Sequence, residues 1–463
     1  MKNTSEDIFE PPVPVVPIGW DVVPFQQAVD VVSDKGRRVK QGSYLPAGKI
    51  PVIDQGQQAI GGFTDDEQMA FDGELPVILF GDHTRSIKFV DTPFAVGAEG
   101  VKILQPRDAY FPKFLYYVLR SLRIPSRGYS RHFQFLRKFH FPLAPEEQQK
   151  RIVAEIEKQF SRLDDAVANL KRVKASLKRY KASVLKAAVE GKLTEDWRKQ
   201  HPNVEPASKL LDRILAERRA KWNGKGHYKE PAKPDVSDLP QLPPHWAWCL
   251  TDALFSFVTS GSRGWARYYS DQGPLFLRVG NLDHDSIRLD LNNLQRVKPP
   301  IGVEGTRTKV ERGDILISIT ADVGMIAVVP AGLDDAYINQ HVSLARPLTG
   351  FCREYLAWYL AARDGGQKMF LQLQRGATKV GLGLDDIRAV PVPLPPLAEQ
   401  EEIVAEVERR LSVIDELETA VEANLTRSDR LRQSILSQAF SGKLSSQQCY
   451  NQDVTARFGR VNL

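Results

Sequence analysis

Side chains that can read DNA bases recur in short polar stretches of this chain. In the first third of the sequence they lie in SDKGRRVKQG (33–42), GDHTRS (81–86) and SRGYSRHFQ (126–134). Further along come SGSRGWARYY (260–269), RVGNLD (278–283), SITADVG (318–324), YINQH (337–341) and RGATKVG (375–381). Arginine can make paired hydrogen bonds to guanine, and asparagine or glutamine can make them to adenine. Lysines and backbone amides between them can hold phosphates.

Any one of these stretches could equally be an ordinary polar turn, but as a set they indicate recognition of DNA. The predicted DNA-contacting residues are Arg37, Lys40, His83, Thr84, Arg85, Lys88, Arg127, Tyr129, Arg131, Arg263, Trp265, Arg278, Asn281, Thr320, Asn339, Gln340 and Lys379. Within this set, contacts to bases are predicted for Arg85, Arg131, Arg263 and Asn281, and contacts to phosphates for Lys40, Lys88 and Lys379.

The chain lacks the patterns that a catalytic or metal site would need. It has no GxGxxG run after a strand, and GQQAIGG (56–62) lacks the lysine and hydroxyl of a phosphate-binding loop. The histidines are isolated from one another, and Cys249, Cys352 and Cys449 stand in no metal-ligand spacing. We therefore expect no catalytic residue, no metal and no cofactor bound by this chain, and cysteines that serve as packing residues.

Composition is compatible with a nucleic-acid partner but does not by itself indicate one. The net charge is only +6 over 463 residues. No apolar run approaches the roughly 18 residues that span a membrane, and the N-terminus does not read as a signal peptide, so a cytoplasmic protein without a membrane partner is expected. Residues 171–192 carry eight Lys and Arg against one Glu, which fits a solvated helix face, DNA phosphates or an acidic partner.

The sequence contains an internal repeat. A shift of 251 positions aligns residues 142–193 with 393–444 without a gap, and 18 of the 52 aligned positions are identical. Both copies place apolar residues at alternating spacings of three and four, followed by glycine at 191 and 442. This pattern predicts two long helices of about 44 residues, each about 65 Å long, that pair as a coiled coil and end in left-handed glycines.

The segments before the helices are related more loosely. VILF (77–80) echoes DILI (314–317), and FPKFLYYVL (111–119) echoes CREYLAWYL (352–360). These segments alternate short β-branched runs with turns, so each predicts a mixed α+β globule. The predicted order is a domain at 1–145, a helix at 146–193, a helical and Pro-rich linker at 194–245, a domain at 246–396, a helix at 397–444 and a tail at 445–463.

This organisation resembles the specificity subunits of Type I restriction–modification enzymes. The similarity spans essentially the whole chain, and its most specific elements are PLPPLAEQEEIVAEVE (393–408), the GKL helix ends and the linker from LLDRILAERRAKW (210–222) to LPQLPPHW (239–246). The first copy departs from the pattern, because PLAPEEQQ (142–149) replaces PLPPLAEQ (393–400). We expect the first helix to survive this change, which would affect only the exit from the preceding strand.

The resemblance implies a fold of two target recognition domains separated by an antiparallel coiled coil, with an internal pseudo-twofold axis. Each domain would read one half of a split, asymmetric sequence of double-stranded DNA. The helices would set the spacing and dock two modification (methyltransferase) subunits, with candidate docking residues Ile152, Ile156, Leu163, Ile403, Val407 and Ile414. Those subunits would bring S-adenosylmethionine, and restriction subunits using ATP and Mg²⁺ would join them.

Two other readings stay open at this point. The chain could be a coiled-coil architectural or regulatory DNA-binding protein without a methyltransferase partner, or an enzyme with an unrecognised site. The target bases and the length of the spacer between the half-sites are not encoded in any pattern of the sequence.

Overall fold

The computed structural model describes residues 9–97, 100–126, 128, 131–222, 227–261, 263–299, 302–374 and 381–444. By its internal contacts the chain divides into two compact units, one formed by residues 1–172 and 421–463 and the other by residues 173–420. Each unit contains one globular domain and part of both long helices, so the division falls within the helices and not at their ends.

The domain of the first unit is built on two four-stranded sheets. The antiparallel sheet has the order β2 (Val29–Val32), β9 (Val101–Pro106), β6 (Val77–Gly81), β7 (Ile87–Val90). The other has the order β3 (Arg38–Val39), β8 (Ala95–Gly97), β4 (Ile50–Ile53), β5 (Gly62–Thr64), with β8 parallel to both β3 and β4. Every residue of β6 is buried, because the first sheet is covered on both faces.

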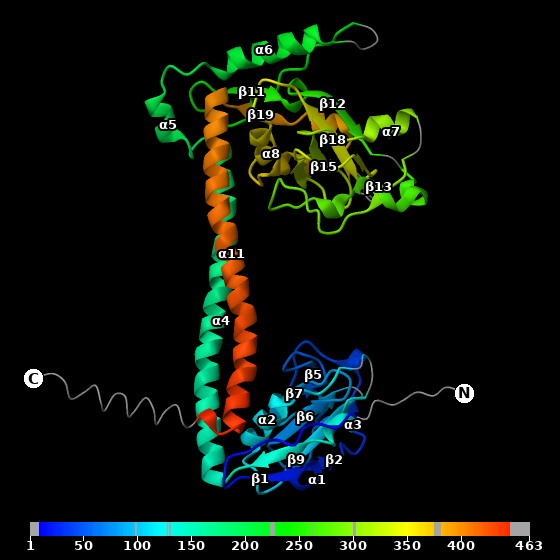
Figure 1. Cartoon of the computed structure of the whole chain (residues 1–463), viewed down its shortest axis with the longest axis vertical. Coiled ribbons are helices and arrows are strands. Elements are labelled where there is room, and N and C mark those ends of the chain that lie inside the picture. The colour runs from blue at the N-terminus through cyan, green and yellow to red at the C-terminus, as the bar shows by residue number, and fades with distance from the viewer. Residues whose placement is uncertain are drawn as a thin grey trace, which may run out of the picture. The chain divides into compact units, whose positions relative to one another are not determined.

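Short helices complete this domain. They are α1 (Phe25–Ala28), α2 (Pro112–Ser121) and α3 (Phe133–Leu136), with 3₁₀ turns at Gln41–Ser43 and Glu67–Met69. Figure 1 shows α2 beside the sheet, and its Phe114 and Leu115 share one hydrophobic core with Ile78 of β6 and Leu104 of β9. The apolar stripe of α2 is therefore what holds it on the sheet.

The domain of the second unit repeats this plan. Its antiparallel sheet has the order β12 (Phe255–Ser260), β18 (Val342–Pro347), β15 (Ile315–Ser318), β16 (Ile326–Val328). Its second sheet has the order β14 (Arg296–Val297), β13 (Tyr269–Leu277), β17 (Ala336–Ile338). The echoed segments VILF and DILI thus fall on β6 and at β15, which are third in equivalent sheets.

The helices of the second domain follow the same scheme. They are α7 (Val303–Thr308), α8 (Arg353–Ala361), α9 (Gly366–Leu373) and α10 (Leu384–Arg388), with 3₁₀ turns at Thr251–Ala253, Trp265–Tyr268 and Val279–Asn281. The echoed segments FPKFLYYVL and CREYLAWYL fall on α2 and α8, so the loose similarity between the two domains reflects one shared fold.

The segment that follows the first long helix packs into the second unit. It forms α5 (Glu195–Gln200) and α6 (Ala207–Ala220). Leu210 and Ile214 of α6 are buried in the core of that unit, and the Ala207 N–H donates to the His245 carbonyl at 2.8 Å. The helix predicted here exists, but it lies against the domain and does not serve only as a connection.

The two long helices occupy aligned positions. They are α4 (Glu146–Val189) and α11 (Leu397–Phe440), each of 44 residues, and the shift of 251 maps one exactly onto the other's bounds. The altered PLAPEEQQ therefore does not displace the start of α4. Gly191 and Gly442, just past the helix ends, have φ of 70° and 74°, the left-handed conformation that the sequence predicts.

The helices pair in opposite directions. In the first unit, Ile156 and Phe160 near the start of α4 share a core with Leu436 near the end of α11. In the second unit, Val184 near the end of α4 shares a core with Val407 near the start of α11. The predicted antiparallel coiled coil is therefore confirmed.

Each domain is joined to its helix by a pair of antiparallel strands. In the first unit β1 (Asp21–Pro24) pairs with β10 (His140–Leu143), and in the second β11 (Ala247–Leu250) pairs with β19 (Pro391–Leu394). The chain thus comes into the domain and leaves it at adjacent points, directly before the helix begins.

A buried glutamine fixes each helix start to its domain. The side-chain oxygen of Gln149 accepts the Phe111 N–H at 2.7 Å, and its nitrogen donates to the carbonyl five residues earlier at 2.8 Å. Gln400, at the aligned position, accepts the Cys352 N–H at 2.9 Å and donates to the carbonyl five residues earlier at 2.8 Å. Both glutamines are fully buried, so these bonds satisfy backbone groups that water does not reach.

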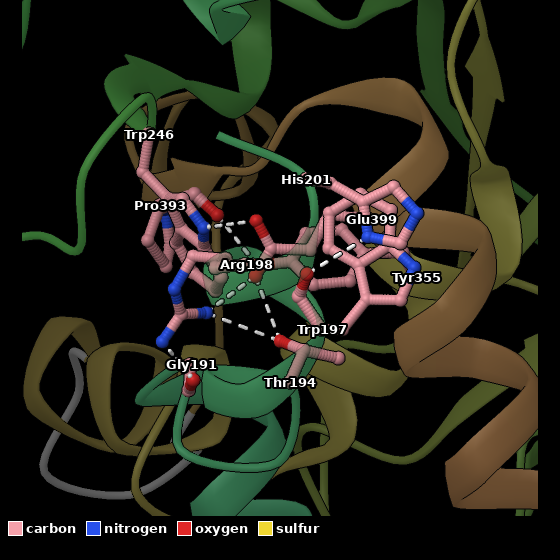
Figure 2. Close-up of polar contacts among 9 residues, drawn as sticks. All are labelled: Gly191, Thr194, Trp197, Arg198, His201, Trp246, Tyr355, Pro393 and Glu399. Carbon is pink, nitrogen blue, oxygen red and sulfur yellow. Dashed lines mark hydrogen bonds and ion pairs between the residues drawn. The ribbon is translucent and has the colours of Figure 1, made fainter. Parts of the chain in front are cut away.

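A tryptophan at the beginning of each domain contacts the residue before this glutamine. The Trp20 indole N–H donates to Gln148 at 2.8 Å, and that of Trp246 donates to Glu399 at 2.8 Å. We call the place where each domain meets its helix start a junction. The junction of the second unit has one further contact, because the Glu399 carboxylate also forms an ion pair with Arg198 (Figure 2).

We predict that Gln400→Ala destabilises the protein. The substitution leaves the half-buried Cys352 N–H and the buried Pro395 carbonyl without their partner, and a buried group left unpaired costs about 1–3 kcal/mol. Thermal and denaturant unfolding of the purified chain measure the loss. Glu401→Ala, at the next and exposed position, is the control and should change the midpoint little. Equal effects of the two substitutions would contradict the role given to Gln400.

Candidate nucleic-acid interface

The turn between β6 and β7 brings several predicted DNA contacts together. Thr84, Arg85 and Lys88 line one cavity of about 670 Å³, and His83 begins the same turn. Arg120 of α2 adds a second guanidinium to the lining. The cavity is therefore polar and cationic, which suits a surface that receives phosphates or base edges.

Hydrogen bonds to Gln55 hold this turn in place. The hydroxyls of Thr84 and Ser86 donate to the Gln55 carbonyl at 2.5 and 2.8 Å, and the His83 N–H donates to its side chain at 3.2 Å. These bonds fix the β6–β7 turn against the loop after β4. A rigid turn presents its outward side chains in one geometry, which sequence reading requires.

Arg85 sits at the tip of the turn in an unusual backbone conformation. Its φ is 60°, a left-handed value that costs a residue with a side chain about 1 kcal/mol or more. The residue is exposed, and its guanidinium donates to the Ile124 carbonyl at 2.9 Å. That bond uses one of five donors, so the others can still reach a ligand.

Lys88 lies deeper than the sequence suggests. Its ammonium is 3.6 Å from the Asp54 carboxylate, and only 11% of its side chain is exposed. Burial lowers the pKa of Lys88, and the neighbouring Asp54 partly offsets this effect. The ammonium of Lys88 thus faces Asp54 in this conformation, and a phosphate contact from Lys88 stays a prediction.

The remaining candidates of the first domain are dispersed. Lys40 and Arg131 are exposed, and Arg37 is half-buried with an ion pair to Asp72 at 3.0 Å. Two further candidates, at positions 127 and 129, lie outside the described residues.

In the second domain the candidates gather around a histidine. Arg278 and Asn339 line a cavity of about 380 Å³ together with His341. The Thr320 hydroxyl lies 2.5 Å from His341 Nδ1, and the Gln340 amide nitrogen lies 3.0 Å from Nε2. Four of the predicted contacts thus converge on one exposed imidazole that the sequence analysis had treated as isolated.

Two candidates of the second domain are structural. Trp265 is 2% exposed and stacks on Phe276 with ring centroids 5.5 Å apart, so it belongs to the core. Asn281 is also 2% exposed, and its amide donates to the carbonyls of Asp290 and Asn293. In this conformation both side chains serve the packing and turns of the domain, and DNA contact by either residue stays a prediction.

Arg263 is exposed and stays a candidate, while Lys379 lies outside the described residues.

The predicted docking residues on the long helices are mostly internal. Ile156, Ile403, Val407 and Ile414 are at most 1% exposed, and Ile152 and Leu163 are half-buried. The apolar alternation that singled them out is the seam between the helices themselves. A partner must therefore bind other, outward-facing positions.

The described part of the chain shows no group of three or more residues placed to hold a metal ion. Within the same residues, no helix combines the length and apolar character needed to cross a membrane.

The sequence analysis missed residues whose roles depend on tertiary contacts. Gln55 lies in GQQAIGG, which attracts attention only as a failed phosphate-binding loop, and Arg120 looks like an ordinary helix-surface residue. Their neighbours in space come from β6 and β7, and no local signal indicates this.

The chain is similar to proteins of known function. Residues 291–427 match the family described as the Type I restriction modification DNA specificity domain. The specificity subunit of the Type I restriction enzyme EcoBI from Escherichia coli is 25% identical over 390 residues, covering 81% of this chain and 74% of that protein. The EcoKI specificity subunit from Escherichia coli strain K12 is 26% identical over 319 residues, covering 66% of this chain and 58% of that protein.

A solved structure shares the fold. It was determined in work on complex assembly and conformational transition of the type I restriction–modification system. It covers 93% of this chain and all of its own, with 19% identity and a TM-score of 0.58. Duplicated domains and paired helices agree with these sequence matches, and the chain is similar to the specificity subunits of Type I restriction–modification enzymes.

Proposed function

We propose that this chain recognises a split DNA sequence, with each domain reading one half. The observation that carries the proposal is the pair of cavities lined by candidate DNA-contacting residues on domains of one fold, at the β6–β7 turn and around His341. The residues around the cavities differ, so the two half-sites should differ too. The chain itself does no catalysis in this scheme.

Methylation and cleavage then belong to partner subunits. We place two modification subunits, carrying S-adenosylmethionine, on the long helices, with restriction subunits that use ATP and Mg²⁺ joining the assembly. Two identical partners need two equivalent surfaces, and an internal repeat supplies them within one polypeptide.

The repeat offers such a surface on the outside of each helix. On α4 the exposed residues Ala154, Lys158 and Ser161 lie at spacings of four and three, on one face. Their aligned counterparts on α11, Ala405, Arg409 and Ser412, are exposed as well. Two of the three pairs are identical and the third keeps its charge, so this stripe is our candidate for docking in place of the buried isoleucines.

Exchange of residues 20–140 for the equivalent domain of a relative tests the two-module proposal. One half of the methylated sequence should change and the other should not, since each cavity lies within a single domain. Mapping of methylated positions in a host that carries the hybrid and its partners measures this. A change in both halves, or in neither, would refute the assignment.

Arg85→Gly should relax specificity in one half-site only. Glycine accepts the left-handed backbone, so the substitution removes the side chain without adding strain. If the guanidinium contacts a base, specific binding weakens by about 1–3 kcal/mol. Titration of the modification complex against DNA with single-base changes measures this.

Lys35→Gly is the matched control for Arg85→Gly, because Lys35 is also left-handed (φ 52°) and lies outside the cavity lining. If both variants lose the same affinity for every sequence, Arg85 does not read a base.

Ser161→Arg and Ser412→Arg should each prevent one modification subunit from binding. Both serines are exposed on helices, where arginine is tolerated, so the fold should be preserved while a large charge fills the proposed contact. Native mass spectrometry should then find one partner bound to each single variant and none to the double variant.

Val413→Arg is the control for Ser412→Arg. Val413 is exposed on the same helix but about 100° around it from Ser412, and arginine already stands at the aligned position 162. Two partners on the double serine variant would rule out this surface.

A further inference from the structure

The first unit has an open cavity at the start of α4. Its volume is about 510 Å³, and its lining includes Trp20, Gln148, Ile152, Gly442 and Leu444. This is the junction where the domain, the beginning of α4 and the end of α11 meet. None of the DNA-recognition candidates lines it, and only its edge, at Ala154 and Lys158, belongs to the proposed docking stripe.

The aligned place in the second unit is filled by the chain itself. The corresponding residues there are Trp246, Glu399, Ile403, Gly191 and Leu193, and the segment that follows Leu193 turns back over them. Figure 2 shows this segment, residues 194–201, around the Glu399 carboxylate.

Arg198 makes most of the polar contacts between this segment and the residues that it covers. Its guanidinium forms an ion pair with Glu399, donates to the Gly191 carbonyl at 2.6 Å and lies 5.9 Å from the Trp246 ring centroid. The Thr194 hydroxyl donates to the same carboxylate at 2.7 Å. A carboxylate that is completely buried is thereby paired and hydrogen-bonded, as its burial requires.

Exposure shows how the two junctions differ. Glu399 is 0% exposed, whereas Gln148 at the aligned position is exposed. Ile403 is 1% exposed, whereas Ile152 is only half-buried. In the second unit, α5 and the turn before it cover Glu399 and Ile403. In the first unit, no described residue covers Gln148 and Ile152 to the same extent.

We propose that the cavity of the first unit binds residues 445–449 of this chain. Leu444 lines the cavity, and 19 residues follow it in the sequence. In the second unit, the five residues from Thr194 to Arg198 are enough to reach Glu399. The same number after Leu444 extends to Cys449.

The residue types at the aligned positions fit this assignment. Ser445 aligns with Thr194 and keeps the hydroxyl, while Cys449 aligns with Arg198 and Gln148 with Glu399. Both members of the ion pair are therefore replaced by neutral residues, and neither is replaced alone. A covered glutamate would need a cation, whereas a covered glutamine does not.

The cavity borders the proposed docking stripe, because Ala154 and Lys158 of the stripe also line it. In the second unit, where the junction is filled, the aligned Ala405 and Arg409 remain exposed, as does Ser412. The segment would thus fill the cavity and leave the stripe on α4 as exposed as its counterpart on α11.

Charge exchange between positions 148 and 449 tests the proposal. Gln148→Glu alone should lower the unfolding midpoint by several degrees, because it would place an unpaired carboxylate under the segment. Cys449→Arg in the same chain should restore at least half of the loss. If position 148 is open to water, Gln148→Glu changes little and Cys449→Arg has no effect on it, and the proposal is overturned.

The second unit supplies the matched control. Arg198→Cys should destabilise the chain by leaving Glu399 unpaired, and Glu399→Gln should recover stability in the double variant. This pair is present in the structure, so it calibrates the rescue expected at positions 148 and 449.

Truncation after Leu444 gives an independent readout. Hydrogen exchange at residues 16–22 and 146–158 should speed up in the truncated chain and slow again when a peptide of residues 445–463 is added. Unchanged exchange on truncation, with protection appearing only when a modification subunit is added, would assign the cavity to the partner and refute the proposal.

Discussion

The structure depends on one buried side-chain contact made twice, the glutamine that ties each helix start to its domain. Gln149 and Gln400 each bridge a backbone N–H of the domain and a carbonyl of the turn before the helix. Because buried polar groups are costly without partners, these bonds allow little change in the angle at which each helix leaves its domain. The paired strands β1–β10 and β11–β19 bring the required backbone groups to that point.

The two junctions share this core but differ in what surrounds it. One lies in the middle of the chain, so a continuous segment passes over it and contributes Arg198 to the buried Glu399. The other lies where the first domain begins and the last helix ends, and there the aligned residue is the neutral Gln148. The two units therefore share their fold and their hydrogen bonds. The buried ion pair is present only at the junction over which the described chain continues.

The helices and the duplicated plan could be predicted from the sequence because their signals are local and repeated. A 251-residue shift, apolar alternation and terminal glycines determine α4 and α11, including their length. The interface could be predicted only in part, since exposure depends on neighbours distant in the chain. Thr84 and Arg85 line a cavity, whereas Trp265 and Asn281, which come from equally polar stretches of the sequence, are buried. His341 gains its neighbours only through the sheet that brings β15 and β18 together.

The adjacent strands at each junction have a consequence for inheritance. A domain whose two ends lie side by side is in effect inserted at a single point of the helical scaffold. The helix starts that follow the two domains are similar in sequence and share, for example, IVAE at 152–155 and 403–406. Genetic crossover within such flanking segments would transfer an entire domain in frame and leave the buried glutamine contacts to re-form around it. Under the proposed function, such an exchange would replace one half of the recognised sequence in a single step.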